Sequence, residues 1–408
     1  MDHYFFIHGD GMYLTKEQES MLSGEGGEVI GRMLRLLVRL GEIYGAERMI
    51  PIGSVQVAGV SYKSIGDPGL EFLKDIAEKQ ARVRVPTTLN PAGMDLEDWK
   101  KLGVPRDFAE KQLQIMDSFK KMGIMMTATC TPYLAGNLPR FREHIAWSES
   151  SAVSFANSVI GARTNREGGP SALAAAFCGV TPNYGLHLNE NRKPHFLITV
   201  KSDLKTSTDF AALGYHVGKL AKNKVPYFRG IRDANVDKLK ALGAAMAASG
   251  AVAMYHVEGS TPEADLMDVK NLETIEVGNR ELSGAIEKLN SGSDLDIIIL
   301  GCPHASLKEI SDLACKLEGK SLKKPLWICT SRVTKEAANR MGFTEIIDKS
   351  GGKVVADTCM VVSPIDRMGY KVTGVDSGKA ANYLPGFCKQ QVVFKSLDDL
   401  LECGSHEG

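Results

Sequence analysis

The stretch LDIIILGCPHASLKE, residues 295–309, decides the fold class of this chain. It opens with the apolar run Leu295–Leu300, broken only by Asp296, and the run ends at the turn Gly301-Cys302-Pro303. Such a short apolar run beside Gly and Pro indicates a strand buried on both faces. Leu307–Leu317 then has apolar residues at helical spacing. Strand, turn and helix in this order are the unit from which parallel sheets are built.

The same alternation continues downstream of this stretch. Pro325–Cys329 and Val354–Ala356 are predicted strands, and Lys335–Met341 is a predicted helix between them. Because strands and helices that alternate form a parallel sheet with helices on both faces, the sequence predicts an α/β fold.

Short apolar runs and helical stretches alternate upstream as well. Strands are predicted at Arg48–Val55, Arg82–Val85, Ile124–Ala128 and His195–Val200, and helices at Thr15–Tyr44, Leu70–Lys79, Asp107–Met122, Phe210–Lys222 and Val236–Ser249. We expect an N-terminal extension at 1–11, with Met12 as a candidate start, an α/β region of one or two subdomains at 12–293, and a C-terminal α/β domain at 294–408 that carries two of the cysteines discussed below.

Composition excludes several classes of protein. The 408 residues include 49 Lys and Arg and 49 Asp and Glu, so the formal net charge is zero, which argues against a nucleic-acid binder. No apolar stretch has the length of a membrane span, and the first residues lack the pattern of a signal peptide. We therefore expect a cytoplasmic protein that does not bind membranes. Eight scattered Cys in a chain of this size do not suggest a disulfide framework.

Three of the cysteines share one context. Cys130, Cys302 and Cys359 each follow a predicted strand. Ligands of open α/β sheets gather outside the carboxyl ends of strands, so these thiols can meet in one crevice. Three thiolates suit an iron–sulfur cluster, and a [4Fe–4S] cluster on three Cys leaves one iron open to substrate as a Lewis acid. A small buried residue at the end of a strand is the competing interpretation, and spacing leaves both open.

Two other metal sites are less well supported. A structural zinc site usually contains a CxxC pair, and the sequence has none. An electron-transfer cluster usually has four protein ligands, against three well-placed Cys here. Five of the nine His, at 187, 195, 216, 256 and 304, lack ligand spacing and are expected to be mostly structural.

Polar and glycine-rich segments leave further alternatives. The turn Gly59-Val60-Ser61-Tyr62 could hold an anion with main-chain N–H groups, or be a plain turn. Ser377-Gly378-Lys379 could be a solvated loop or place a lysine against an acid. Arg163, Asn165 and Arg166 are polar candidates for the site, and a buried structural network explains them equally well.

At these motifs the sequence resembles the aconitase X family, in the form whose large and small subunits are separate chains. The matching motifs are VAGVSYKSIGDPGLEFL (57–73), VRVPTTLNPAGMD (83–95), ATCTPYL (128–134), HIAWSESSAVSFANSVIGARTNREGGPSALAAA (144–176), YGLHLNENR (184–192), LGCPHASLKE (300–309), ADTCMVV (356–362) and DSGKAANYLPG (376–386). They cover essentially residues 12–394. Long motifs in one order are specific, and the resemblance implies an aconitase-like fold of parallel-sheet α/β domains around a central cleft.

The resemblance also implies a site. It implies a [4Fe–4S] cluster on Cys130, Cys302 and Cys359. It implies substrate contacts at Gly59, Val60, Ser61, Asn90, Pro91, Glu149, Ser150 and Lys379, with Glu149 and Ser150 as candidate catalytic residues. In aconitases proper the base is a serine on a swivelling domain, and we expect that domain to be absent from this chain. By resemblance the domain is a separate small subunit, so we expect a heterodimer whose large chain alone is inactive.

The version AGVSYKSIGDPGLEFL is most similar to archaeal members of the family. These are hydro-lyases that dehydrate (R)-5-phosphomevalonate, a small anion, to trans-anhydromevalonate 5-phosphate in isoprenoid biosynthesis by a modified mevalonate pathway. Bacterial members act on cis-3-hydroxy-L-proline, which is the first alternative. A non-catalytic iron–sulfur protein is the alternative from another class.

Overall fold

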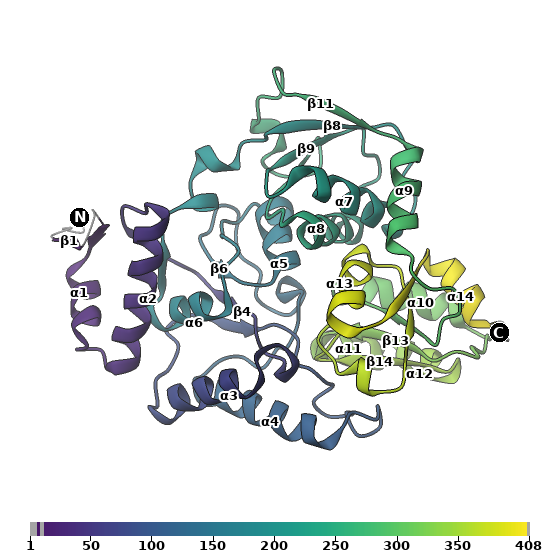
Figure 1. The fold of residues 1–408 in the computed structure, drawn as a ribbon, viewed down its shortest axis with the longest axis horizontal. Helices are drawn as coiled ribbons and strands as arrows, with labels where there is room; N and C mark the ends of the chain where they lie inside the picture. The colour runs from purple at the N-terminus through teal and green to yellow at the C-terminus, as the bar shows by residue number, and fades with distance from the viewer. Residues whose placement is uncertain (1–5, 9–11, 406–408) are drawn as a thin grey trace.

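The computed structural model describes residues 6–8 and 12–405 (Figure 1). The helices are α1 (Lys16–Ser23), α2 (Glu28–Tyr44), α3 (Tyr62–Glu78), α4 (Arg106–Lys121), α5 (Ser150–Phe155), α6 (Gly169–Cys178), α7 (Ser207–Ala221), α8 (Val236–Gly250), α9 (Asn279–Leu289), α10 (Leu307–Leu317), α11 (Arg332–Arg340), α12 (Phe343–Lys349), α13 (Gly378–Cys388) and α14 (Leu397–Ser405). None of these helices is long and apolar enough to cross a membrane.

The strands are short and distributed over several sheets. They are β1 (Phe6–His8), β2 (Met12–Leu14), β3 (Met49–Pro51), β4 (Val55–Val57), β5 (Thr87–Leu89), β6 (Ala146–Trp147), β7 (Val180–Pro182), β8 (Phe196–Val200), β9 (Pro226–Arg229), β10 (His256–Val257), β11 (Thr274–Val277), β12 (Ile297–Leu300), β13 (Leu326–Thr330), β14 (Gly352–Ala356), β15 (Val372–Val375) and β16 (Gln391–Phe394).

Three sheets are parallel throughout. Their strand orders are β5-β4-β6, β10-β9-β8-β11 and β14-β13-β12-β15-β16. The pairs β1-β2 and β3-β7 are antiparallel. The predicted parallel α/β fold is therefore confirmed, and the decisive run of residues 295–300 contains β12, the central strand of the five-stranded sheet.

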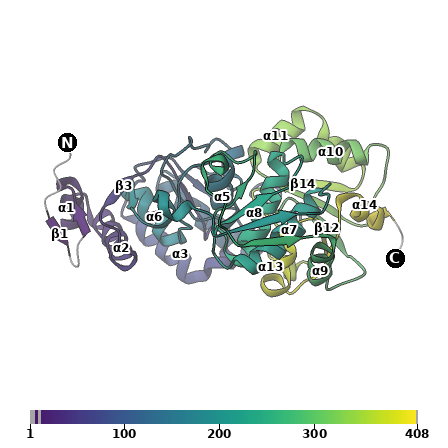
Figure 2. The ribbon, with the colours of Figure 1, turned by 90° about the horizontal axis from the view of Figure 1, so that it is seen from above.

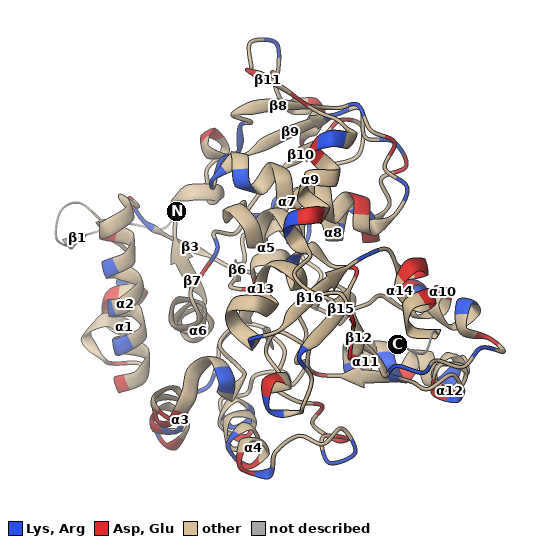
Figure 3. Ribbon diagram, turned by 45° about the vertical axis from the view of Figure 1, so that its right-hand side comes forward, with Lys and Arg blue, Asp and Glu red and all other residues tan. Residues whose placement is uncertain are grey.

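Figure 1 shows three groups of elements, with the N-terminal helices, the β8–β11 sheet and the C-terminal sheet in different parts of the molecule. Seen from above in Figure 2, α1 and α2 lie at one end of an elongated molecule and α14 lies at the other. The ribbon in Figure 3 shows Lys and Arg positions interspersed with Asp and Glu positions along the outer helices.

The apolar core divides the chain differently from the predicted boundaries. One buried cluster collects residues between Met12 and Cys178. A second runs from Phe196 to Phe394 and includes both Leu242 of α8 and Val392 of β16. The boundary predicted at residue 293 therefore separates two sheets that share apolar packing, and the domain division stays a prediction.

The predicted single helix over residues 15–44 is wrong. The chain forms α1 and α2 there, separated by the sequence Gly-Glu-Gly-Gly at 24–27. Gly24 and Gly27 have φ of +93° and +100°, which side-chain-bearing residues rarely adopt. Of the predicted extension at 1–11, residues 6–8 form β1, and residues 1–5 and 9–11 lie outside the described residues.

The strands predicted at 82–85 and 124–128 are also wrong, since β5 forms instead at Thr87–Leu89, between them. β5 pairs with β4, and residues 124–129 run along its other side. The Met125 N–H donates to Thr87 O at 2.9 Å, and the Thr129 N–H donates to Leu89 O at 2.8 Å. Ala128, at φ +38°, interrupts the extended backbone just before Cys130. Tertiary pairing, rather than local propensity, selects the strand.

Candidate functional site

Three cysteines from distant parts of the chain meet in the interior. Cys302 follows β12, Cys359 follows β14, and Cys130 follows the segment beside β5. All three are buried. The Cys302 thiol donates a hydrogen bond to Cys359, and Cys130 lies within electrostatic reach of both. The structure thus brings the three thiols together, and we call Cys130, Cys302 and Cys359 the thiol site.

The thiols differ in their readiness to ionise. The hydrogen bond from Cys302 lowers the pKa of Cys359 to about 7 against the effect of burial. Donating that bond, together with burial, raises the pKa of Cys302 well above its ordinary value. Burial raises the pKa of Cys130 to about 12. One thiolate near neutral pH therefore has two thiols beside it, all shielded from solvent.

The chemistry of this site fits an iron–sulfur cluster better than a single hard cation. Three sulfur atoms and no carboxylate make up the donor set, and thiolates select soft metals and clusters. Among residues 6–8 and 12–405, no group of three His, Cys, Asp or Glu side chains is arranged to hold one metal ion. Cysteines that bind separate irons of a cluster need not converge on one point, so this geometry is compatible with a cluster.

A buried ion pair lies near the thiols. Lys379, in the first turn of α13, pairs with Glu149, the N-cap of α5. The Lys379 ammonium also donates to Ser151 Oγ at 3.1 Å. Asn90 Nδ2 donates to the second oxygen of Glu149 at 2.8 Å, and Ser150 Oγ donates to the first at 3.3 Å. Four predicted site residues therefore share one hydrogen-bonded group, and Lys379 is not a solvated lysine.

Both members of the pair are charged at neutral pH. Burial by itself would raise the pKa of Glu149, but the charge and hydrogen bond of Lys379 outweigh it and lower that pKa to about 2. Burial likewise opposes the charge on Lys379, and Glu149 and the nearby thiols raise its pKa above the ordinary value. A carboxylate with so low a pKa is a weak proton acceptor.

The turn at 59–61 abuts both the segment after Cys359 and the loop that carries Asn90 and Pro91. Ser61 caps α3, and its hydroxyl donates to Val362 O, three residues beyond Cys359, at 2.7 Å. A Cβ added to Gly93 would lie only 2.7 Å from Ser61 Oγ. The turn and the loop are therefore packed against each other.

Gln112 and Asp95 join these segments and were missed by sequence reasoning. Gln112 Nε2 donates to Val60 O at 2.9 Å, and its Oε1 accepts from the Gly93 N–H at 2.9 Å. Asp95 is fully buried and accepts from the Ala356 N–H at 3.0 Å. The sequence did contain one signal for Gln112, because it is a polar residue at an inward-facing position of the helix α4.

The polar segment 146–170 divides into two parts. Its start contains Glu149 and Ser150, whereas Arg163 and Asn165 bind the segment that follows α6 and β7. Arg163 donates to His187 O at 2.8 Å, and Asn165 Nδ2 donates to Tyr184 O at 3.0 Å. Arg166 is exposed. The contacts therefore favour the structural interpretation for Arg163 and Asn165, whereas Arg166 does not belong to a buried network.

Family models for the first, second and third domains of aconitase X match residues 11–190, 194–287 and 295–405. The chain belongs to the aconitase X family. Its predicted membership is thereby confirmed, and the matches account for nearly the whole sequence. Which residues of this aconitase X chain act on substrate or metal stays a prediction.

Two relatives are similar over the full length of the chain. The phosphomevalonate dehydratase large subunit of Methanocaldococcus jannaschii is 55% identical, over 96% of this chain and 100% of the relative. The crystal structure of Thermococcus kodakaraensis aconitase X in its holo-form is 51% identical, with a TM-score of 0.91 over 96% of this chain and 99% of that one. The cis-3-hydroxy-L-proline dehydratase of Pseudomonas aeruginosa is 35% identical, over 96% of this chain but 70% of the relative.

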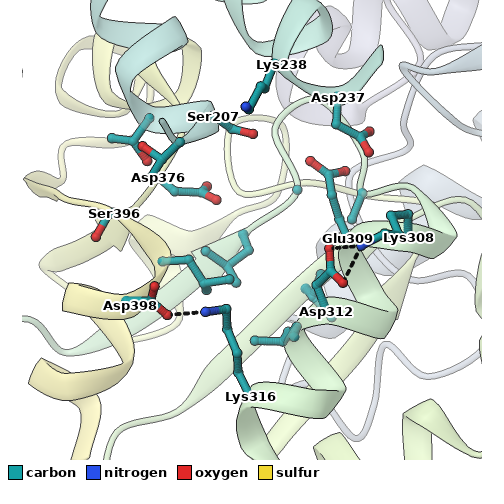
Figure 4. Close-up of a pocket in the computed structure, with 18 of the residues that line it drawn as sticks. Ser207, Asp237, Lys238, Lys308, Glu309, Asp312, Lys316, Asp376, Ser396 and Asp398 are labelled. Carbon is teal, nitrogen blue, oxygen red and sulfur yellow. Dashed lines mark hydrogen bonds and ion pairs between the residues drawn. The ribbon is translucent and has the colours of Figure 1, made fainter. Parts of the chain in front are cut away.

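A cavity of about 550 Å³ lies near the thiol site without including any predicted site residue. It is lined by the starts of α7, α8 and α14 and by α10 (Figure 4). Among its charged groups, Lys308 pairs with Asp312 and Lys316 with Asp398. The three cysteines of the thiol site are buried, and none of them lines that cavity.

Proposed function

We propose that this chain is the large subunit of a phosphomevalonate dehydratase, a hydro-lyase that converts (R)-5-phosphomevalonate to trans-anhydromevalonate 5-phosphate. One observation carries the proposal: the relative of that name is 55% identical and matched over its entire length. The hydroxyproline dehydratase is more distant, and this chain spans only 70% of it. We infer a cytoplasmic enzyme.

Cys130, Cys302 and Cys359 would hold the iron–sulfur cluster, which we propose is of the [4Fe–4S] type. Three neighbouring buried thiols, two of them hydrogen-bonded to each other, with Lys379 nearby to offset negative charge, support this assignment. When bound, such a cluster with one open iron supplies a Lewis acid at the hydroxyl that leaves.

Lys379 would bind an anionic group of the substrate. An ammonium has three donors, and Glu149 and Ser151 take two of them here, so one remains for a carboxylate or phosphate oxygen. The start of α3, with Gly59, Val60 and Ser61 before it, would add main-chain N–H groups for the same purpose. Asn90 and Pro91 would border the substrate on the neighbouring loop.

Glu149 and Ser150 would orient Lys379 and the substrate rather than remove the proton. Glu149 is already paired, and its lowered pKa of about 2 leaves it a weak base. The Ser150 hydroxyl is bonded to the same carboxylate. We therefore propose that the base comes from a separate small subunit, in a heterodimer. The name "large subunit" of the archaeal relatives and the extra length of the hydroxyproline dehydratase support this arrangement.

The proposal is tested by loading the chain with iron and sulfide in the absence of oxygen, together with its small subunit. kcat/KM is then measured on phosphomevalonate and on cis-3-hydroxy-L-proline. We expect phosphomevalonate to be preferred by at least about tenfold, because a charge-assisted phosphate contact contributes about 1.5–3 kcal/mol. A preference for hydroxyproline would establish the first alternative, and a fully loaded complex inactive on both compounds would indicate a non-catalytic iron–sulfur protein.

A further inference from the structure

One buried histidine contacts all three segments that carry the thiols. His304 is fully buried and follows Cys302 by two residues. Its main-chain N–H donates to Cys130 Sγ at 3.1 Å. Its Nδ1 lies 2.9 Å from the hydroxyl of Thr129, the residue before Cys130. Its Nε2 lies 2.9 Å from the carbonyl oxygen of Thr358, the residue before Cys359.

The contacts fix how the ring is protonated. Thr358 O is only an acceptor, so Nε2 must carry the proton and donate. Nδ1 of the neutral ring then accepts from the Thr129 hydroxyl, which in turn accepts from the Thr131 N–H at 3.2 Å. The His304 carbonyl oxygen accepts from Lys240 at 3.3 Å. Each ring nitrogen is thus used, and each is used by a different thiol-bearing segment.

These bonds connect parts of the chain that the sequence keeps far apart. Cys130 and His304 are 174 residues apart, and Thr358 is 54 residues beyond His304. A planar ring that is held at both nitrogens fixes the separation of the two segments it joins. The backbone of His304 belongs to the third segment, the one that carries Cys302, so the ring also fixes the position of that segment. The N–H bond to Cys130 Sγ acts on the sulfur directly, and hydrogen bonds to ligand sulfurs influence the reduction potential of a cluster.

We propose that His304 is a positioning residue that holds the three thiol-bearing segments at the separation needed for the cluster. The inference rests on the proposed function, because it takes the thiol site as the site of the cluster. It assigns His304 no part in proton transfer.

The experiment uses the two-chain complex prepared without oxygen and compares His304→Leu and Thr129→Val with the unaltered protein. We expect iron affinity, measured by competition with a chelator, to fall about 10- to 100-fold in His304→Leu, as for residues that orient metal ligands. Thr129→Val removes one contact of His304 and should give a smaller fall and an altered electron paramagnetic resonance spectrum. His304→Gln, which retains an N–H donor on the Thr358 side, should recover part of the affinity.

His256 provides the matched control. It is also fully buried, and its Nε2 also bonds a main-chain carbonyl oxygen, that of Arg192, at 2.8 Å. His256→Leu should lower the melting temperature and leave iron affinity and the spectrum of the folded fraction unchanged. Unaltered affinity and spectrum in both His304→Leu and Thr129→Val would overturn the inference while leaving the cluster in place. Equal iron content in the unaltered protein and Cys302→Ser would overturn the cluster assignment itself.

Discussion

Two regions of the molecule bury polar and ionisable groups in different ways. In the Arg192 network (Arg192, Glu263 and Asn157), every guanidinium nitrogen donates. Arg192 binds Glu263 at 2.9 and 3.0 Å, and it also reaches Asn157 and the carbonyl oxygens of two other residues. At the thiol site Cys302 bonds Cys359, and Cys130 accepts from the main-chain N–H of His304. Every guanidinium nitrogen of the Arg192 network is thus used within the protein. The sulfur atoms of the thiol site can still bind a metal.

This difference distinguishes the Arg192 network, which is structural, from the thiol site, which is the candidate functional site. Amino-acid composition alone does not distinguish them. Segment 146–170 contributes Asn157 to the Arg192 network, and it also contributes Glu149 to the ion pair with Lys379 near the thiol site. Both regions are buried and polar. What distinguishes the thiol site is three soft donors from three chain segments with a cation, Lys379, close by.

Replacing a cysteine of the thiol site should have the largest effect. It changes the thiol site and leaves the Arg192 network intact. Cys130→Ser or Cys359→Ser should abolish the brown absorbance and the activity, because the cluster loses one of three ligands. Cys315→Ser, at an exposed position in α10, and Cys403→Ser should change neither. Iron and sulfide per chain provide the measurement, and a full iron content in Cys359→Ser would rule out the assignment.

Breaking the Arg192 network should cost stability and leave the cluster alone. Arg192 and Glu263 have side chains only 1% and 5% exposed, so Arg192→Met leaves a buried carboxylate without its partner. We expect the free energy of unfolding to fall by about 3–5 kcal/mol, measured by denaturant titration. Iron per folded chain should stay at the level of the unaltered protein. Arg192→Met/Glu263→Met should recover much of the loss, and an unchanged stability of Arg192→Met would contradict the account.

Lys379→Met should weaken catalysis without removing the cluster. The loss of a charge-assisted contact to the substrate should lower kcat/KM by at least about tenfold. Because Lys379 is buried against Glu149, this variant should also be less stable. Glu149→Gln/Lys379→Met should restore stability and stay impaired in catalysis. If the single variant keeps the kinetics of the unaltered protein, Lys379 has no role in binding substrate.

A smaller effect, of pH on stability, is expected from the buried His187. Burial, with the charges of His144, Arg192 and Arg163, lowers the pKa of His187 to about 3. The unfolded chain binds this proton near pH 6.5 and the folded chain does not until about pH 3, so stability is complete above about 6.5 and declines as pH falls. Between pH 7 and 5.5 the contribution of His187 should fall by about 1 kcal/mol. Urea titrations of the unaltered protein and His187→Gln should differ in this slope, and parallel slopes would contradict the expectation.

The sequence predicts the C-terminal sheet well and the loops around the site poorly, for a physical reason. Runs such as Ile297–Leu300 are apolar because they are buried on both faces, so composition alone reveals the strand. The backbone near Cys130 is instead set by pairing with β5 and by the positive φ of Ala128, neither of which leaves a local pattern. His304 looked structural because its contacts, Thr129 and Thr358, are remote in the chain.

The sequence predicted which residues belong to the candidate site better than it predicted the hydrogen bonds and ion pairs between them. Motif resemblance selected Glu149, Asn90 and Lys379, and the structure joins them in one hydrogen-bonded group. No spacing in the sequence indicates that Lys379 is already paired with Glu149. That pairing adds a physical reason, beyond the resemblance, to expect the base on the small subunit.

Turnover with and without the small subunit tests the central claim most directly. The large chain, loaded with iron and sulfide without oxygen, is assayed for trans-anhydromevalonate 5-phosphate alone and after mixing with purified small subunit. The account predicts no product from the large chain alone and steady turnover from the mixture. Robust dehydration by the isolated, loaded large chain would contradict it and would place the base on Ser61, Ser150 or Glu149.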